Sequence, residues 1–345
     1  MSYKATYDAA KLNPEKFWME AAEKVDWITP PSKALFDDNA PFYEWFSDAE
    51  VNTCFNAVDR HVAAGRGEKV AFHWIGEPGD RRTVTYNDLL REVQKTANAL
   101  KALGVIKGDR VAIYMPMVPE VAIAMLACAR LGAAHSVVFS GFPANALADR
   151  INDATAKVLI TADGGYRKGN FFELKPIADE ALKSAASITG VLVYQRRQPG
   201  TAGTTAMQTG RDHWWHEFVP GQPAECPADP MPAEQLLYLL YTSGTTAKPK
   251  GIMHTSAGYL LGASFTHRAV FDIKPDDVYW CAADVGWITG HTYIVYGPLA
   301  NGATQVMYEG TPDTPAWDRW WEIIAALKVN ILYCAPTAIR AFMRQ

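Results

Sequence analysis

Residues 236–251 read Leu-Leu-Tyr-Leu-Leu-Tyr-Thr-Ser-Gly-Thr-Thr-Ala-Lys-Pro-Lys-Gly. The first five form an unbroken apolar run with the length and composition of a buried strand. The chain leaves this strand with hydroxyls and lysines, and residues 235–271 contain no Asp or Glu, although the formal net charge of the chain is −4. Hydroxyls, backbone N–H groups and ammonium groups are donors that suit phosphate oxygens. The stretch therefore predicts a polyphosphate-binding loop directly after a strand.

The order of residues distinguishes this loop from an ordinary connector. Composition alone fits an exposed Ser/Thr/Gly/Lys/Pro connector equally well, and the Walker pattern G-x-x-x-x-G-K-[ST] is absent. The order resembles the signature T-S-G-[ST]-T-G-x-P-K-G of the AMP-forming acyl-CoA synthetase superfamily, with Ala247 where glycine is usual. If that position needs a positive φ, alanine costs on the order of 1 kcal/mol.

The resemblance implies a role for the loop in ATP chemistry. In this superfamily the loop holds the β- and γ-phosphates and neutralises the charge that develops on pyrophosphate. The implied ATP- and phosphate-binding residues are Thr242, Ser243, Gly244, Thr245, Thr246, Lys248 and Gly251. The implied catalytic residues are Lys248 and Lys250.

Length and composition exclude several classes of protein. The chain has 345 residues, of which 49% are hydrophobic, so it can bury one large core or two smaller ones. Charged residues make up 20% and nearly balance, so nothing indicates a nucleic-acid-binding surface. The five cysteines are scattered and form no C-x-x-C pair, which favours reduced thiols in the cytoplasm over a disulfide framework or a zinc site. We assign no metal-ligating side chains.

The sequence predicts no membrane-spanning segment. Residues 1–11 lack the apolar region of a signal peptide. Prolines and charged residues interrupt the most apolar region, 111–139, and its longest uncharged piece, 121–129, is too short to span a bilayer. We therefore expect a soluble, cytoplasmic protein without a membrane partner.

Strands and helices alternate from residue 85 onward, which predicts an α/β fold of parallel sheets with flanking helices. Residues 1–83 are rich in aromatic side chains and are expected to form a mostly helical N-terminal extension. Residues 84–218 are expected to form a first α/β subdomain, and residues 219–345 a second, incomplete one that carries the phosphate loop. Five prolines within residues 220–232 separate the two subdomains.

Hydrophobic periodicity, together with capping residues, prolines and glycines, predicts the bounds of the individual strands and helices. The predicted strands cover residues 110–114, 135–139, 157–162, 191–194, 236–240, 278–281, 303–308 and 330–334. The predicted helices cover residues 85–104, 119–132, 144–154, 177–184, 256–270 and 316–327, and a last one starts near residue 336. Thr85 and Asp88 are typical of a capping box, Pro119 of a first helical residue, and Gly132 of a helix end.

Further stretches narrow the resemblance to acetyl-CoA synthetases. Trp45, Asn52 and Asp59 lie in a pattern similar to the N-terminal extension of that family. Residues 138–143, Val-Phe-Ser-Gly-Phe-Pro, follow a predicted strand, and the resemblance implies that Gly141 lets coenzyme A approach the backbone. Without the resemblance, core aromatic residues and an ordinary turn explain these stretches.

Residues 162–170, Ala-Asp-Gly-Gly-Tyr-Arg-Lys-Gly-Asn, also follow a predicted strand. In acetyl-CoA synthetases the matching segment contacts coenzyme A. The resemblance therefore implies that coenzyme A is bound by Arg167, Lys168, Gly169 and Asn170. Asn170 stands where a second arginine is usual, and Lys168 can supply part of that charge. Taken alone, the segment fits a solvated turn.

Residues 280–291 resemble the pattern W-C-x-A-D-x-G-W-x-T-G-H of the same family. The resemblance implies an acyl pocket formed by Trp287, Ile288 and Thr289. Thr289 is also expected to touch coenzyme A, and relatives specific for propionate usually carry valine there. A tryptophan wall suits a very small acid, because it fills the space that a longer chain needs.

Residues 308–313 and 330–340 match the same family, so the resemblance covers nearly the whole chain. Asp313 stands where an asparagine that contacts coenzyme A is usual, which removes a donor from that contact. Asp284 and His291 are expected to have structural roles. The sequence contains no G-x-S-x-G elbow, no H-E-x-x-H and no G-x-G-x-x-G after a strand.

The resemblance implies a two-step ligase. Acetate attacks the α-phosphate of ATP, bound with Mg²⁺, to give acetyl-adenylate, and the thiol of coenzyme A then takes the acetyl group and releases AMP. The alternatives are a propionyl-CoA synthetase and a non-catalytic chain that binds nucleotide or coenzyme A. The family also carries a C-terminal lysine through which acetyltransferases and deacetylases act. That lysine and the family's adenine, ribose and magnesium motifs do not occur here, so we expect a truncated chain that is inactive by itself.

Overall fold

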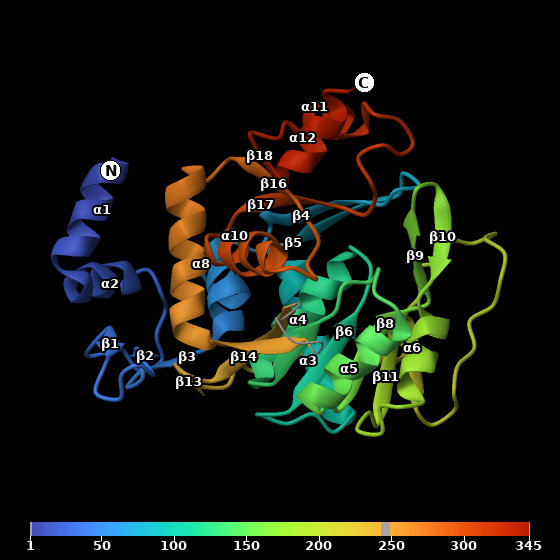
Figure 1. Ribbon diagram of the computed structural model, residues 1–345, viewed down its shortest axis with the longest axis horizontal. Helices are drawn as coiled ribbons and strands as arrows, with labels where there is room; N and C mark the ends of the chain where they lie inside the picture. Colours follow the sequence, from blue (N-terminus) through green and yellow to red (C-terminus); the bar gives the residue numbers. More distant parts are fainter. Residues whose placement is uncertain (1, 243–248, 345) are drawn as a thin grey trace.

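Two mainly parallel sheets form the body of the protein, one above the other in Figure 1. The structure is a computed structural model that describes residues 2–242 and 249–344. Helices cover both sheets, and the N-terminal segment lies at one side (Figure 1). This architecture confirms the predicted α/β class with parallel sheets and flanking helices.

The first sheet has seven strands. Their spatial order is β12 (Asp212–Trp214), β11 (Gly190–Tyr194), β8 (Val158–Ala162), β6 (Arg110–Tyr114), β7 (Ala134–Val137), β14 (Leu236–Thr242) and β15 (Lys250–Thr255). The flanking helices are α3 (Tyr86–Ala102), α4 (Pro119–Leu131), α5 (Ala144–Ala154) and α6 (Lys175–Leu182). Val111 and Ile113 of β6 pack in the core that contains α3 and α4, while Ala112 and Tyr114 pack with α5 and α6. The sheet is therefore buried on both faces, as parallel sheets require.

The second sheet has five strands. Their spatial order is β18 (Ile331–Cys334), β16 (Val278–Ala282), β17 (Thr304–Tyr308), β4 (Val70–Ile75) and β5 (Arg81–Thr85). The associated helices are α8 (Ser256–Phe271), α9 (Ile288–Gly290), α10 (Gly297–Ala300), α11 (Arg319–Leu327), α12 (Pro336–Phe342) and the π-helical η3 (His291–Tyr296). Trp280 packs on one face with Trp320, whereas Tyr279 and Cys281 pack on the other face with η3.

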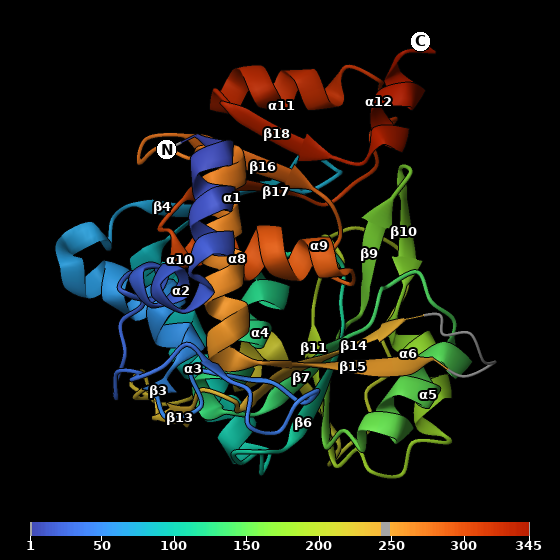
Figure 2. The ribbon, with the colours of Figure 1, turned by 60° about the vertical axis from the view of Figure 1, so that its left-hand side comes forward.

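The N-terminal segment packs on α8. It contains α1 (Tyr3–Leu12), α2 (Pro14–Ala22), the short strands β1 (Leu35–Phe36), β2 (Glu44–Trp45) and β3 (Glu50–Val51), and the π-helical η1 (Phe55–Asp59) and η2 (Val62–Arg66). Ala21 and Ala22 of α2 join Leu260 and Leu261 of α8 in one apolar cluster, and Figure 2 shows α1 and α2 beside α8. The N-terminal extension thus packs on the main body through α8.

The prediction that residues 1–83 are mostly helical is wrong for its last part. Strands β4 and β5 belong to the second sheet, where Gln305 to Tyr308 of β17 pair with Phe72 to Ile75 of β4. The partner strand follows more than 200 residues later in the chain, so no local pattern announces the pairing. The run 70–75 is also short, and its partner β5 contains three charged or hydroxyl side chains before Val84, so the pair lacks a strong strand signal.

The phosphate-loop strand also lies elsewhere than expected. The sequence places β14 at the start of the second subdomain, but β14 pairs in parallel with β7 of the first sheet, at Tyr238 opposite His135. Strand β15, which the sequence analysis does not predict, turns back antiparallel beside β14. The rings of Tyr238 and His135 stack at 5.5 Å with an interplanar angle of 11°, and both are fully buried. Buried aromatic packing on the first sheet therefore determines the position of β14.

The predicted capping signals of α3 and α4 are confirmed. The Thr85 side chain accepts from the Asp88 N–H, and the Asp88 side chain accepts from the Thr85 N–H, so the capping box at the start of α3 is present. Pro119 is the first residue of α4, and Gly132 ends it in the left-handed region. Eight predicted strands and seven predicted helices all occur within a few residues of their expected ends, among them α6 at Lys175–Leu182 and β11 at Gly190–Tyr194.

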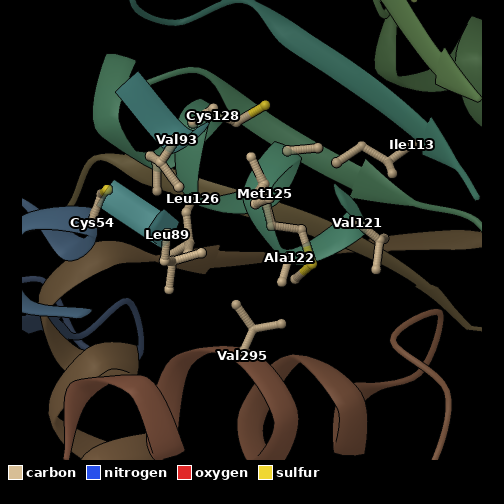
Figure 3. Close-up of a cluster of buried hydrophobic side chains, with 14 of the residues drawn as sticks. Cys54, Leu89, Val93, Ile113, Val121, Ala122, Met125, Leu126, Cys128 and Val295 are labelled. Carbon is tan, nitrogen blue, oxygen red and sulfur yellow. The ribbon is translucent and has the colours of Figure 1, made fainter. Parts of the chain in front are cut away.

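The largest core lies between α3, α4, β6 and η3. Figure 3 shows Leu89 and Val93 of α3 facing Leu126 of α4, with Val295 of η3 on the opposite side. These four side chains are fully buried. Because η3 packs against β16 of the second sheet, this core joins the helices that cover both sheets into one apolar layer. Within the described residues, no helix is both long and apolar enough to cross a bilayer.

An ion pair joins the N-terminal segment to α4. Arg130 donates to the two carboxylate oxygens of Asp59 at 2.8 Å each. The side chains are 2% and 16% exposed. Asn52 donates to the carbonyl oxygens of Arg130 and Asp229, so the family-like residues Asn52 and Asp59 both anchor the extension.

Replacing Asp59 with alanine is expected to leave a buried, unpaired guanidinium. Asp59→Ala should lower the free energy of unfolding by about 3–5 kcal/mol, measured by urea denaturation. Asp26→Ala is the control, because Asp26 also approaches an arginine, at 3.7 Å, but its side chain is 55% exposed. That change should stay within about 0.5 kcal/mol. Equal losses for both variants would show that the Asp59–Arg130 pair has no special role.

Candidate functional site

A cleft of about 920 Å³ lies where the carboxyl ends of strands from both sheets converge. Parallel α/β sheets bind their ligands at this edge. From the first-sheet side it is lined by Pro116, Met117, Phe139, Ser140, Tyr166, Arg167 and Phe172. From the second-sheet side it is lined by residues 280–284, Trp287, Thr289, 308–312, Trp320 and 333–338. Five of the stretches that resemble the family therefore contribute residues to this one cleft. They are residues 138–143, 162–170, 280–291, 308–313 and 330–340.

The predicted CoA-binding segment is a β-hairpin. Strands β9 (Gly164–Arg167) and β10 (Asn170–Glu173) pair antiparallel, and the turn residues Lys168 and Gly169 have φ of 53° and 74°. Arg167 lines the cleft, whereas Lys168, Gly169 and Asn170 lie at the exposed tip. The segment follows β8, as its sequence predicts, whereas its hairpin form has no signal in the sequence.

Glu77 holds the hairpin tip against the second sheet. Its carboxylate accepts from the Lys168 and Gly169 N–H groups at 3.1 and 2.7 Å, and from the Thr311 N–H at 3.1 Å. A hydrogen bond with Thr311 lowers the pKa of Asp313, and the charge of Lys168 adds to that effect. The predicted CoA residues Lys168 and Asp313 therefore lie near each other, although one is in the hairpin turn and the other follows β17 of the second sheet.

Arg196 is the strongest polar feature beside the cleft, and the sequence analysis missed it. Its guanidinium donates to Glu309 at 2.6 and 2.8 Å and pairs with Asp80 at 3.1 Å. It lies between the rings of Trp74 and Tyr166, at 5.0 and 4.7 Å. Burial raises the pKa of Glu309, and the contact with Arg196 acts in the opposite direction. Arg196 follows β11 within a loop that has no motif, so only the fold reveals its partner.

Phe139 and Trp287 line the cleft, and Phe142 packs against both of them; we call these three rings the aromatic wall. Phe139 lies 5.6 Å from both other rings, and Phe142 and Trp287 meet edge to face at 6.0 Å. A Cβ at Gly141 would lie 2.5 Å from the Phe139 ring. Gly141 is thus needed for the packing of this wall, and its expected contact with coenzyme A stays a prediction.

The three predicted acyl-pocket residues differ in position. Trp287 and Thr289 line the cleft. Ile288 is 43% exposed and does not line the cleft. Adjacent residues at the start of the short helix α9 point in different directions, which separates Ile288 from its neighbours. The assignment of all three to an acyl pocket stays a prediction.

Asp284 is the carboxylate of the 280–291 stretch that lines the cleft. Its Oδ1 accepts from the Gly286 N–H at 2.7 Å. Burial raises the pKa of Asp284 to about 6, while the Gly286 hydrogen bond and the charge of Arg167 act in the opposite direction. Asp284 supports the turn that carries Trp287, which agrees with a structural role.

His291 lies apart from Asp284, inside the core. It is fully buried, and its ring packs at 4.6 Å on Tyr238 and at 5.4 Å on His135. Burial lowers its pKa to about 4. A neutral, stacked imidazole in the core cannot exchange protons with a ligand in the cleft, so the two residues do not form an acid–base pair.

The phosphate-loop residues are only partly within the described chain. Thr242 ends β14 and lies opposite Lys250 of β15, and Tyr241 lies opposite Gly251. Thr242, Lys250 and Gly251 are exposed and do not line the cleft. The remaining predicted residues of this loop fall outside the described residues: Ser243, Gly244, Thr245, Thr246 and Lys248, together with Ala247. Their roles stay predictions.

Two protein families match the chain, and together they cover nearly all of it. The family described as AMP-binding enzyme matches residues 59–345, and the one described as acetyl-coenzyme A synthetase N-terminus matches residues 3–57. An acetyl-coenzyme A synthetase of Streptomyces coelicolor is 59% identical over 339 residues, which make up 98% of this chain and 52% of the relative.

Other relatives of the same name give a similar result. Those of Gemmatimonas aurantiaca and Mycobacterium tuberculosis are each 56% identical, over 342 and 343 residues that make up 52% of each relative. The chain therefore spans about half the length of the curated relatives it matches.

The raised pKa of Asp284 predicts a pH-dependent stability. The folded carboxyl has a pKa of about 6, whereas an unfolded Asp has one of about 3.9. Between these values the folded state binds more protons, so this group lowers stability as the pH rises and has its full cost above pH 6. Asp284→Asn keeps an acceptor for the Gly286 N–H and removes the charge.

The measurement is urea denaturation of both proteins at about pH 4 and pH 7.5. The free energy of unfolding of the variant, relative to the unsubstituted chain, should increase by about 2–3 kcal/mol from the lower to the higher pH. Asp318→Asn, which removes an exposed carboxylate, is the control, and it should change the free energy of unfolding by no more than about 0.5 kcal/mol. A constant difference for Asp284→Asn would contradict a raised pKa.

Proposed function

Because the chain belongs to the family of AMP-binding enzymes, we propose that the protein that carries it activates acetate with MgATP and transfers the acetyl group to coenzyme A. One observation supports this most strongly. The hairpin 164–173 and the stretch 280–291 come from different sheets, yet both line one cleft. Relatives named acetyl-coenzyme A synthetase are up to 59% identical over nearly the whole chain.

The proposed reaction has two steps. A carboxylate is a poor electrophile, so an acetate oxygen first attacks the α-phosphorus of ATP, and the bond to pyrophosphate breaks. The thiol sulfur of coenzyme A then attacks the acyl carbon, loses its proton, and the bond to AMP breaks. Both steps build negative charge on phosphate oxygens, which fixed N–H groups and cations stabilise. Magnesium arrives as the ATP complex and is a part of the substrate.

The hairpin formed by β14 and β15, which we call the phosphate hairpin, is proposed to hold the leaving pyrophosphate. Thr242, Lys250 and Gly251 flank the loop, and Lys248 lies within it. The two lysines supply positive charge, and the hydroxyls and N–H groups supply donors. Lys248 and Lys250 are the proposed catalytic residues, since they act on charge that develops only during bond breakage.

The hairpin 164–173 and the loop after β17 are proposed to hold coenzyme A. Arg167 lines the cleft and is suited to a phosphate, because its guanidinium donates two parallel hydrogen bonds. Lys168, Gly169 and Asn170 extend this surface at the tip. Gly141, Thr289 and Asp313 complete the proposed CoA contacts.

Two other functions fit the same residues. A propionyl-CoA synthetase would use the same cleft with a wider acyl pocket, and a non-catalytic protein would bind nucleotide or coenzyme A without reaction. Acetate-dependent formation of AMP in the presence of coenzyme A, measured on the protein that carries this chain, separates enzyme from binder. A series of acids separates the two synthetases. Control by acetylation of a lysine elsewhere in such a protein is an additional proposal from the family.

Replacing Lys248 and Lys250 together by alanine tests the phosphate assignment. The double variant should weaken MgATP binding by about tenfold or more, since hydrogen bonds to charged groups contribute roughly 1.5–3 kcal/mol each. AMP lacks the β- and γ-phosphates, so its affinity should change by less than about twofold. Titration calorimetry measures both. Lys101→Ala combined with Lys183→Ala, two exposed lysines, is the charge-matched control. If the binding of MgATP and of AMP weakened equally, the loop would not contact the β- and γ-phosphates.

Shortening the side chain of Thr289 tests the acyl pocket. Thr289→Ser removes one methyl group from the cleft, so kcat/KM for propionate relative to acetate should rise by up to about tenfold. Ile288→Ala, whose side chain does not line the cleft, should change this ratio by less than about threefold. A rise with Ile288→Ala alone would mean that Ile288, and not Thr289, limits the acyl chain.

A further inference from the structure

Arg150 on α5 is a buried arginine held between two aromatic rings. Its Cζ lies 4.8 Å from the ring centroid of Phe142 and 5.6 Å from that of Tyr241. The residue is 9% exposed, and its guanidinium donates to the Ala146 carbonyl oxygen at 2.6 Å. In residues 2–242 and 249–344, no carboxylate forms an ion pair with it. A buried guanidinium without a counter-ion is costly, and contacts with two ring faces offset part of that cost.

One of the two rings belongs to the phosphate hairpin. Tyr241 is in β14, one residue before its end, and its hydroxyl donates to Asp153 of α5 at 2.7 Å. Its ring lies over Gly251, the partner residue in β15, where a Cβ would come within 3.1 Å of the ring. Arg150 and Asp153 thus attach the base of the hairpin to α5 by two different contacts.

The other ring belongs to the aromatic wall of the cleft. Phe142 meets Trp287 edge to face at 6.0 Å, and Phe139 contacts both. A continuous series of contacts therefore runs from Tyr241 through Arg150 and Phe142 to Trp287. It connects β14 of the first sheet with the segment that follows β16 of the second sheet. The guanidinium is the link between the two ends of the series.

We propose that Arg150 is a positioning residue that couples the phosphate hairpin to the aromatic wall. The names of the two sides rest on the proposed function, but the contacts do not. A planar guanidinium can stack on two rings at once, whereas an ammonium group cannot. A shift of Tyr241 moves the guanidinium against Phe142, so order on one side favours order on the other. Such coupling is reciprocal.

Amide hydrogen exchange of the whole chain tests the coupling without any ligand. Arg150→Met keeps the length of the side chain and removes the charged plane. Amide exchange should become faster by about threefold or more in two places, because local opening costs less free energy there. One is the hairpin, residues 236–242 and 250–255, and the other is the segment 284–291, which carries Trp287. Arg150→Lys, which keeps the charge but not the plane, should show a similar change. Faster exchange confined to α5, or to only one of the two segments, would overturn the proposal.

A matched control separates coupling from general loosening. Arg268 on α8 also lies over a ring, 6.0 Å from Phe265, and it does not line the cleft. Arg268→Met should leave the exchange of both segments unchanged within about twofold. Tyr241→Phe removes the hydrogen bond to Asp153 and keeps the ring beside Arg150, so exchange should rise in the hairpin and, through Arg150, also in 284–291; a rise confined to the hairpin would overturn the coupling. If Arg268→Met reproduced the pattern of Arg150→Met, Arg150 would have no specific role.

Magnesium tripolyphosphate serves as the probe for the functional side. Added to the unsubstituted chain, it should slow exchange in 284–291 by about twofold or more, and this effect should disappear in Arg150→Met. Slowing that persists in Arg150→Met would overturn the coupling through Arg150. If tripolyphosphate did not bind to the unsubstituted chain, the phosphate role of the hairpin would be wrong. The ligand-free exchange pattern would still decide the coupling itself.

Discussion

The buried ion pair between Arg196 and Glu309 fixes the two sheets relative to each other at the cleft. Arg196 follows β11 of the first sheet, and Glu309 follows β17 of the second. Their side chains are 4% and 3% exposed and 2.6 Å apart. Breaking a buried pair costs far more than the pair contributes relative to apolar residues, so these side chains hold a single geometry. Tyr166 of the hairpin 164–173 also donates its N–H to Glu309, which brings that hairpin to the same point.

This arrangement explains how the cleft can serve a reaction that needs little covalent chemistry from the protein. Phosphoryl and acyl transfers are accelerated mainly by placing reactants and by fixed dipoles and charges. Arg167 reaches the cleft from the first sheet, while Thr289 and Asp284 reach it from the second. The distance between these groups depends on the contact between the sheets and not on any one loop. The aromatic wall, made by Phe139, Phe142 and Trp287, crosses the same boundary.

Much of the fold was predictable, because its signals are local. The capping box at Thr85, Pro119 at a helix start and Gly132 at a helix end act over a few residues and gave correct boundaries. Long-range pairings were not predictable: β4 with β17, and β14 with β7, are decided by buried packing between distant segments. In the site, motif order identified Arg167, Trp287 and Thr289, all of which line the cleft. Arg196 and Glu77 lie outside such motifs, and only their partners in space reveal their roles.

The central claim is that the protein carrying this chain joins acetate to AMP before the thioester forms. Acetate labelled with ¹⁸O in both carboxyl oxygens tests it directly, since the oxygen that attacks the α-phosphorus stays with AMP when the sulfur displaces it. The measurement is the mass of the AMP formed with ATP and coenzyme A. We expect AMP that contains one labelled oxygen. Unlabelled AMP, or label in inorganic phosphate instead, would contradict it.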